Sequence, residues 1–147
     1  MQEITKVALD AMGGDNAPVE IVKGAIDAVN SRKDIKVFFV GQEDVVKEEL
    51  AKYSYPADQI EVVHASEVIE MAEPPVVAIR RKKDSSMVVA MKMVKEGLAD
   101  AFVSAGSSGA ILVGGQTIVG RIKGIKRPPL APIIPTETGM SLIIDCG

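Results

Sequence analysis

Tryptophan is absent from this chain of 147 residues, and all aromatic residues together make up only 3% of it. Surfaces that bind single-stranded nucleic acid stack bases on aromatic rings, so this scarcity argues against a nucleic-acid partner. The one cysteine, Cys146, excludes a disulfide within the chain and fits a reducing, cytoplasmic environment. No spacing of His, Cys or acidic residues resembles a metal site, so we expect no metal and no cofactor.

Long hydrophobic segments are also missing. No uninterrupted apolar run is long enough to span a bilayer. The N-terminal residues MQEITKVALD contain an acidic residue and no apolar core, so they do not read as a signal peptide. The hydrophobic content of 47% and charged content of 25% are typical of a globular domain with a real core.

Charge is distributed unevenly between the two halves. Residues 1–73 hold 7 Lys/Arg and 15 Asp/Glu, whereas residues 74–147 hold 10 Lys/Arg and 5 Asp/Glu. Two short windows, 80–83 and 121–127, carry 8 of the 17 basic residues. A cationic second half favours an anionic ligand or an acidic partner.

Apolar strands and amphipathic helices alternate along the chain. Strands are predicted at 6–11, 35–41, 60–65 and 100–106, and two more at 130–134 and 141–145. Helices are predicted at 19–32, 43–53, 85–99 and 107–122. This alternation predicts an α/β fold with a mostly parallel sheet covered on both faces. Ligands of such sheets bind beyond the carboxyl ends of the strands, so the strand-to-helix turns are the places to inspect. The final strand has no helix after it, and we expect the chain to be part of a longer domain.

The first of these turns contains Gly13, Gly14 and Asp15. Adjacent glycines allow unusual backbone angles and close approach to another group, and Asp15 or Asn16 can cap the following helix. The turn is therefore either a tight, capped turn or a ligand contact.

The second turn, SAGSSGA at 104–110, also follows a strand and opens a helix. Main-chain N–H groups at a helix start attract anions, and serine hydroxyls add donors, as a metal-free phosphate site requires. The candidate ligands are Ser104, Gly106, Ser107, Ser108 and Gly109. The stretch matches neither a dinucleotide fingerprint nor a Walker loop, and an ordinary capped helix is the alternative.

Two basic windows are further candidates. Arg121, Lys123 and Arg127 come just after the glycine-rich helix and could bind an anion. The cluster at 80–83 consists of Arg80, Arg81, Lys82 and Lys83. Like charges packed together repel, so each window is either an anion site or a solvated charged face. His64 shows no Ser-His-Asp arrangement and reads as structural, and nothing near Cys146 indicates a reactive thiol.

Five motifs occur in the order and spacing of a known family. They are LDAMGGDNAP, EVIEMAEPPVVAIRRKKDSSM, SAGSSGA, VGRIKGIKRPPLAPIIPT and LIIDCG. Together they resemble the N-terminal half of the PlsX-type phosphate acyltransferases of bacterial phospholipid synthesis. The family's C-terminal half is not represented. The family's second turn usually reads Ser-Ala-Gly-Asn-Thr-Gly-Ala, and Ser107 and Ser108 stand in place of Asn and Thr here.

The resemblance implies an activity and partners. Family members transfer a long fatty acyl group from acyl carrier protein to inorganic phosphate, giving acyl phosphate. They are homodimers with a fold similar to isocitrate/isopropylmalate dehydrogenases and phosphotransacetylases. They are cytoplasmic and attach peripherally to the membrane through the half not represented here.

The resemblance also suggests roles for the candidate residues. Phosphate would bind at the two turns with Arg121, Lys123 or Arg127, and the 80–83 cluster would steer acidic acyl carrier protein. Three alternatives stay open: a coenzyme A-dependent phosphotransacetylase, a nicotinamide-dependent decarboxylating dehydrogenase, and a non-enzymatic acyl-carrier or membrane-associated scaffold.

Overall fold

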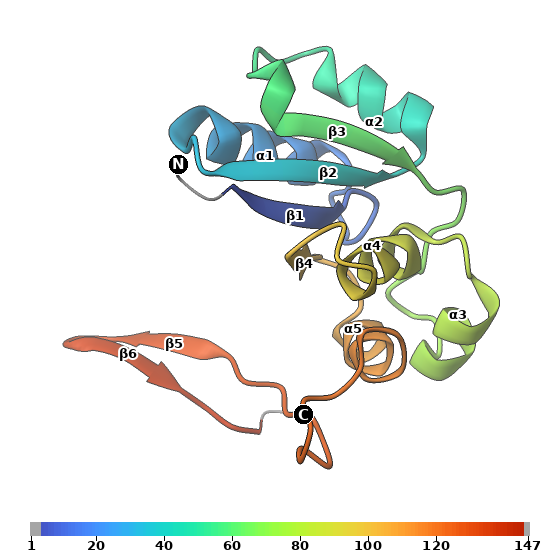
Figure 1. The fold of residues 1–147 in the computed structure, drawn as a ribbon, viewed down its shortest axis with the longest axis vertical. Coiled ribbons are helices and arrows are strands. Elements are labelled where there is room, and N and C mark those ends of the chain that lie inside the picture. Colours follow the sequence, from blue (N-terminus) through green and yellow to red (C-terminus); the bar gives the residue numbers. More distant parts are fainter. Residues whose placement is uncertain (1–3, 146–147) are drawn as a thin grey trace.

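A four-stranded parallel sheet is the centre of the molecule (Figure 1). The computed structural model describes residues 4–145, so Cys146 lies outside the described residues. The strands are β1 (Thr5–Asp10), β2 (Ile35–Gly41), β3 (Ile60–His64) and β4 (Ala101–Val103), in the order β3-β2-β1-β4. All three pairings are parallel, which confirms the predicted α/β class.

Helices cover both faces of this sheet and make three layers. On one face lie α1 (Val19–Ser31) and α2 (Glu43–Leu50), and a short 3-10 turn, η1 (Ala57–Gln59), precedes β3. On the other lies α4 (Ser86–Lys95), followed outward by α3 (Pro75–Arg81) and α5 (Ser108–Gly114), which continues as a π-helical turn, η2 (Gly115–Val119) (Figure 1). The three-layer arrangement predicted from the alternation is confirmed.

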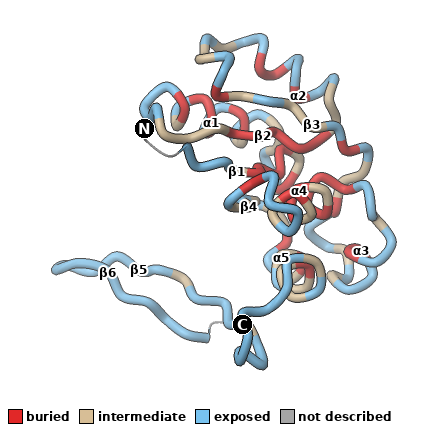
Figure 2. Tube along the Cα trace, in the orientation of Figure 1, coloured by how far each residue is buried: buried red, intermediate tan, exposed pale blue. Residues whose placement is uncertain are grey.

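The alternation of side chains along the strands builds the core on both faces. Phe39 packs with α1 and α2, whereas its neighbour Phe38 packs with α4, because successive strand residues point to opposite faces. The buried residues concentrate in the two central strands and the helices against them (Figure 2). Since both faces are buried, β2 reads as a continuous apolar run, IKVFFVG.

Two further strands do not join the sheet. β5 (Ile133–Thr136) and β6 (Gly139–Leu142) pair antiparallel as a separate hairpin that projects from the body (Figure 1). All of their residues are exposed, including Ile133 at 64% and Met140 at 79% (Figure 2). The prediction of two strands here is confirmed, with boundaries shifted by two to three residues, but they pair with each other.

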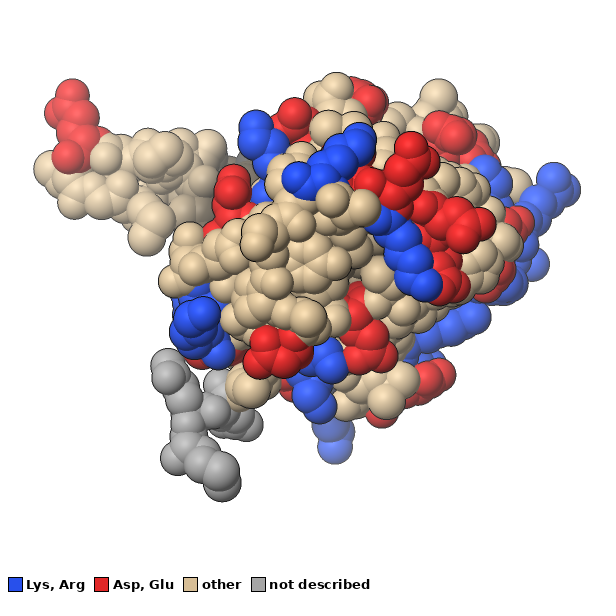
Figure 3. Space-filling view, turned by 90° about the horizontal axis from the view of Figure 1, so that it is seen from above, with Lys and Arg blue, Asp and Glu red and all other residues tan. Residues whose placement is uncertain are grey.

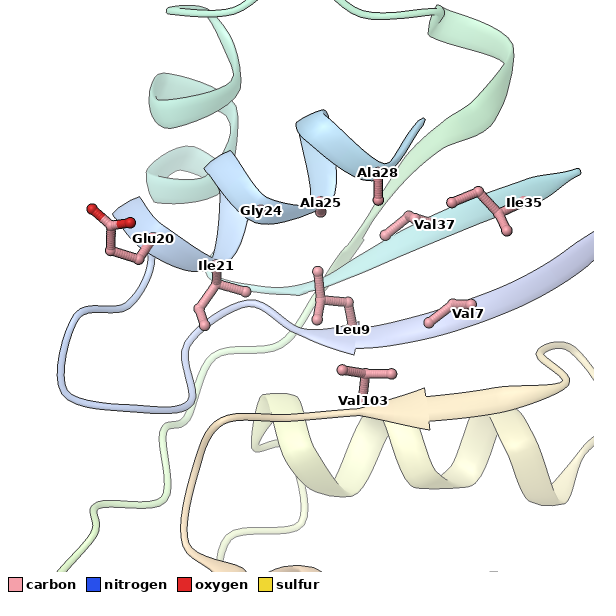
Figure 4. A pocket seen from close by; sticks show the side chains of 10 residues that line it. All are labelled: Val7, Leu9, Glu20, Ile21, Gly24, Ala25, Ala28, Ile35, Val37 and Val103. Carbon is pink, nitrogen blue, oxygen red and sulfur yellow. The ribbon is translucent and has the colours of Figure 1, made fainter. Parts of the chain in front are cut away.

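An apolar cavity of about 360 Å³ lies on the α1 side of the sheet, beside β4 (Figure 4). Leu9 and Val37 of the central strands, Ile21 of α1 and Val103 of β4 line it. Val103 is 50% exposed, since β4 has a strand partner on only one side. Within residues 4–145, no strand pairs with the outer edge of β4.

Helix boundaries are set by particular caps. Ser85 caps α4 by accepting the N–H of Val88 at 3.4 Å. The prediction that Asp15 or Asn16 caps α1 is wrong. Pro18 occupies that position, directly before the helix, and no side chain caps the helix.

Candidate functional site at the carboxyl edge of the sheet

The two glycine-containing turns meet at the carboxyl ends of β1 and β4. These strands are adjacent and parallel, so residues following them leave the sheet at the same edge. A β-carbon added to Gly14 would lie 3.0 Å from the carbonyl oxygen of Ala105, and one added to Gly106 would lie 3.4 Å from Cα of Gly13. The turns are thus in contact; we call residues 13–15 and 104–109 the paired turns.

Glycine is required in the paired turns for two different reasons. Gly14 has φ of +107°, a conformation that side chains disfavour. Gly13 needs space, because a β-carbon there would lie 2.3 Å from Oδ2 of Asp10. Gly109 also needs space, since its β-carbon would lie 2.8 Å from Cγ of Pro75 in α3. These contacts make the glycines a packing requirement whatever the ligand.

Sequence reasoning missed Asp10, the carboxylate at the centre of this edge. Asp10 is the last residue of β1 and only 1% exposed. Its Oδ1 accepts from Ser86 Oγ at 2.6 Å and from the N–H of Met12 at 3.2 Å, and its Oδ2 accepts from Ser104 Oγ at 2.7 Å. The available signal was an acidic residue inside the apolar run KVALDA, which must find donors if the strand is buried.

Two serines of the serine-rich turn, Ser104 and Ser107, form hydrogen bonds within the protein. Ser104 donates to Asp10 and its oxygen accepts the N–H of Gly106 at 3.0 Å. Ser107 is the N-cap of α5 and accepts the N–H of Ala110 at 3.4 Å. Ser104 and Gly106 therefore hold the turn in shape, and Ser108 is the exposed hydroxyl.

Several main-chain donors of the paired turns stay unengaged. Within residues 4–145, the N–H groups of Gly13, Gly14, Ser108 and Gly109 donate no hydrogen bond. Beside Gly14 and Asp15 is a cavity of about 380 Å³, closed on its far side by residues 68–72. Of these four residues Gly14 lines this cavity, whereas Ser108 lines another one. A free main-chain N–H beside a partly polar cavity can hold an anion without a metal.

The segment that closes this cavity is fastened at several points. Asp84 accepts from Ser66 Oγ at 2.5 Å and from its N–H at 3.0 Å, and these bonds lower the pKa of Asp84 below its usual value. Lys82 forms an ion pair with Glu73 and donates to the carbonyl of Val68 at 2.6 Å. The hydrogen bond from Lys82 lowers the pKa of Glu73.

Lys82 therefore differs from its three basic neighbours. Within residues 4–145, Lys82 is the one member of the 80–83 cluster that forms an ion pair with a carboxylate. No described carboxylate lies within ion-pairing distance of Arg80, Arg81 or Lys83. Arg80 and Arg81 are exposed at the end of α3. On the face seen in Figure 3, basic and acidic side chains are mixed around an uncharged area, unlike the run of basic residues at 80–83.

The basic residues at 121–127 lie apart from the paired turns. The helix formed by α5 and η2 begins at Ser108 and ends at Val119, and at about 1.5 Å per residue this separates its ends by roughly 15–20 Å. Arg121 and Lys123 follow the far end and line a separate cavity. The structure does not bring these two residues to the turns.

Arg127 lies closer along the returning chain. The next residue, Pro128, lines a cavity of about 230 Å³ together with Ser108. The Arg127 side chain is 80% exposed, and its nearest carboxylate oxygen, on Asp145, is 4.0 Å away. Among the basic residues at 121–127, Arg127 is thus the one directly followed by a residue that lines a cavity with the serine-rich turn.

No described helix is both long and apolar enough to cross a membrane. In the same part of the chain, no three His, Cys, Asp or Glu side chains are grouped to hold a metal ion.

The three-layer α/β fold is similar to that of a solved phosphotransacetylase. The solved phosphotransacetylase of Streptococcus pyogenes superposes with a TM-score of 0.66 over 98% of this chain and 47% of that one. At 18% identity, this likeness establishes the fold.

Sequence comparison gives the family. Residues 5–147 match the model of the family described as "Fatty acid synthesis protein", and the chain belongs to that family. Proteins named phosphate acyltransferase from Alkaliphilus oremlandii and Clostridium beijerinckii are each 54% identical over 97% of this chain. The predicted family resemblance is confirmed. The chain spans 42% and 43% of the length of these two relatives.

Proposed function

We propose that the protein takes part in transferring a long-chain fatty acyl group from acyl carrier protein to inorganic phosphate. The observation that carries this proposal is the 54% identity to proteins named phosphate acyltransferase. The paired turns support it, since they combine free main-chain donors with a neighbouring cavity.

The reaction is a direct displacement on a thioester. A phosphate oxygen attacks the carbonyl carbon, a C–O bond forms, and the C–S bond breaks to give acyl phosphate and a thiolate, which takes up a proton. Phosphate is itself the nucleophile, so the protein's task is to hold it close to the carbonyl and to donate to the developing oxyanion. The N–H groups of Gly13, Gly14, Ser108 and Gly109 are our candidates for both roles.

Positive charge would offset the repulsion between a phosphate dianion and the electron-rich thioester. Arg127 is our candidate for this positive charge, because the residue that follows it, Pro128, lines the same cavity as Ser108. Arg121 and Lys123 stay as weaker candidates, since they lie beyond the far end of the helix. Arg127→Ala should raise the KM for phosphate more than it changes the stability of the fold; an unchanged KM would remove Arg127 from the site.

The unpaired cations of the 80–83 cluster suit an acidic protein partner. We propose that Arg80, Arg81 and Lys83 attract acyl carrier protein, while Lys82 shapes the surface through its ion pair with Glu73. Homodimer formation, a cytoplasmic location and peripheral membrane attachment are proposed on the family resemblance alone.

Release of carrier-protein thiol from long-chain acyl carrier protein, with and without phosphate, tests the proposal. It should be run on the 147-residue chain and on the chain extended to the length of its relatives, each of verified mass. Phosphate-dependent release by either supports the proposed function, and release by the shorter chain places the site within it. Binding of acyl carrier protein without phosphate-dependent release by either would favour a scaffold.

A coenzyme A-dependent phosphotransacetylase is the second candidate, favoured by the structural likeness to such an enzyme. The same assay with long-chain acyl-coenzyme A separates the two. Faster release from the coenzyme A thioester than from the carrier protein would support this second function.

A further inference from the structure

Asp10 is a buried charged group for which the proposed chemistry has no direct use. It is 1% exposed, yet it occupies the end of the strand between the paired turns and α4. Burying a carboxylate is unfavourable unless donors surround it, and here three donors converge on its two oxygens. An apolar residue would fill the end of β1 without these demands, so the carboxylate calls for a specific explanation.

The first consequence of Asp10 is the orientation of the Ser104 hydroxyl. An ionised carboxylate only accepts, and a main-chain N–H only donates. Ser104 must therefore give its single hydrogen to Asp10, over 2.7 Å, and offer a lone pair to the N–H of Gly106, over 3.0 Å. This chain of bonds fixes the peptide group that leads into the start of α5.

The second consequence is the distance between the two turns. The same Oδ2 that accepts from Ser104 lies beside Gly13, so close that a β-carbon added to Gly13 would be 2.3 Å from it. One carboxylate oxygen is thus in contact with both turns, while Oδ1 is tied to Ser86 in α4. Asp10 connects β1, α4 and both turns in a single buried cluster.

We propose that Asp10 is a positioning residue for phosphate. Through Ser104 and Gly106 it sets the direction of the main-chain donors at Ser108 and Gly109, and through its contact with Gly13 it aligns them with the donors of the first turn. Asp10 does not itself touch phosphate. This inference rests on the proposed function, because it presumes that phosphate binds at the paired turns.

Asp10→Asn is the decisive variant, since it keeps the shape of the side chain and replaces one acceptor oxygen with an NH2 donor. With its amide nitrogen toward Ser104, the residue donates to Oγ, and the hydroxyl hydrogen of Ser104 must turn away. We expect the phosphate KM to rise about tenfold, with kcat and the KM for acyl carrier protein within about twofold. A purely structural role would instead reduce the folded fraction, lowering the apparent kcat and leaving the phosphate KM unchanged.

Ser86→Ala is the matched control. It removes a donor from the same carboxylate, but on Oδ1 and from α4 rather than from the turns. It should reduce stability and leave the phosphate KM unchanged. An equal rise of this KM in Ser86→Ala, or none in Asp10→Asn, would overturn the positioning role.

Two further measurements keep the inference testable. If Asp10→Asn does not fold, Ser104→Ala breaks the same link from its other end and should raise the phosphate KM; no rise would overturn the inference. Hydrogen exchange of the Gly106 amide, followed by NMR, needs no activity and should accelerate in Asp10→Asn. If the unmodified protein shows no phosphate-dependent thiol release, the proposed function fails. Independently of activity, unchanged exchange of the Gly106 amide in Asp10→Asn would refute the link from Asp10 through Ser104 to Gly106.

Discussion

Replacing Gly13 by alanine tests the contact between the paired turns most directly. The added β-carbon would lie 2.3 Å from Oδ2 of Asp10 and 2.8 Å from Oγ of Ser104. Neither neighbour is the free end of a flexible chain, because the two are hydrogen-bonded to each other. The turn must therefore move by a sizeable fraction of an ångström, or the bond must break.

The cost follows from two effects. Overpacking a close-packed site destabilises by about 1–3 kcal/mol. Loss of the bond between Ser104 and Asp10 would add about 1.5–3 kcal/mol, as for hydrogen bonds to charged groups. Partial relaxation makes the two overlap, so we expect Gly13→Ala to lower the free energy of unfolding by about 2–4 kcal/mol. For a domain of this size the midpoint temperature should fall by roughly 5–15 °C.

Gly24→Ala is the matched control, because it makes the same chemical change in open space. Gly24 lies inside α1, and no atom comes within 4 Å of its added β-carbon. Alanine there should stabilise the helix by about 0.5–1 kcal/mol. Urea unfolding of both variants measures the difference. A Gly13→Ala protein as stable as the unmodified one would refute the packing described for the paired turns.

Three other perturbations have defined outcomes. Gln59→Ala should lower the free energy of unfolding by about 1–3 kcal/mol in urea titrations, because the buried Gln59 amide donates to two main-chain carbonyls, at 2.8 and 2.7 Å. Glu73→Gln should reduce acid sensitivity: Lys82 lowers the folded-state pKa of Glu73 below its usual 4.5, so this stabilisation is present above that value and lost as pH falls through the folded pKa. Unfolding curves between pH 3 and pH 7 measure this, and an unchanged acid limb would contradict it. Replacing Arg80 and Arg81 together by alanine should slow association with acyl carrier protein and flatten its salt dependence in stopped-flow measurements, whereas unaltered salt dependence would count against the patch.

Most of the fold could be predicted because the type of each helix or strand follows from the spacing of apolar residues within its own short stretch of sequence. The strand at 35–41 coincides with β2, and the helix at 19–32 matches α1 to within one residue. The helix at 85–99 was too long: α4 ends at Lys95, and Gly97 adopts φ of +74° just beyond it. Residues 75–81 gave no clear helical pattern, yet they form α3, whose buried positions are only Ala78 and Ile79.

The site was predictable in its position but not in its bonding. Consecutive parallel strands and their turns pointed to one sheet edge, and the structure brings Gly13 and Gly14 into contact with Ala105 and its neighbours there. The bonds that organise that edge join residues 76 and 94 positions apart, so no local window contains both partners. Asp10 went unrecognised for this reason. Whether the turns bind phosphate stays a prediction.

The strand order has a consequence for synthesis on the ribosome. β1 can pair with β2 once residue 41 has emerged, but its other edge waits for β4 at Ala101–Val103. At about 5–20 residues per second, that interval is roughly 3–12 s. During it the carboxylate of Asp10 lacks its Ser104 donor, and the inner strand of the finished sheet is an outer strand of the nascent one. The N-terminal layers thus emerge early with an open flank, which is the stage at which chaperone binding would matter most.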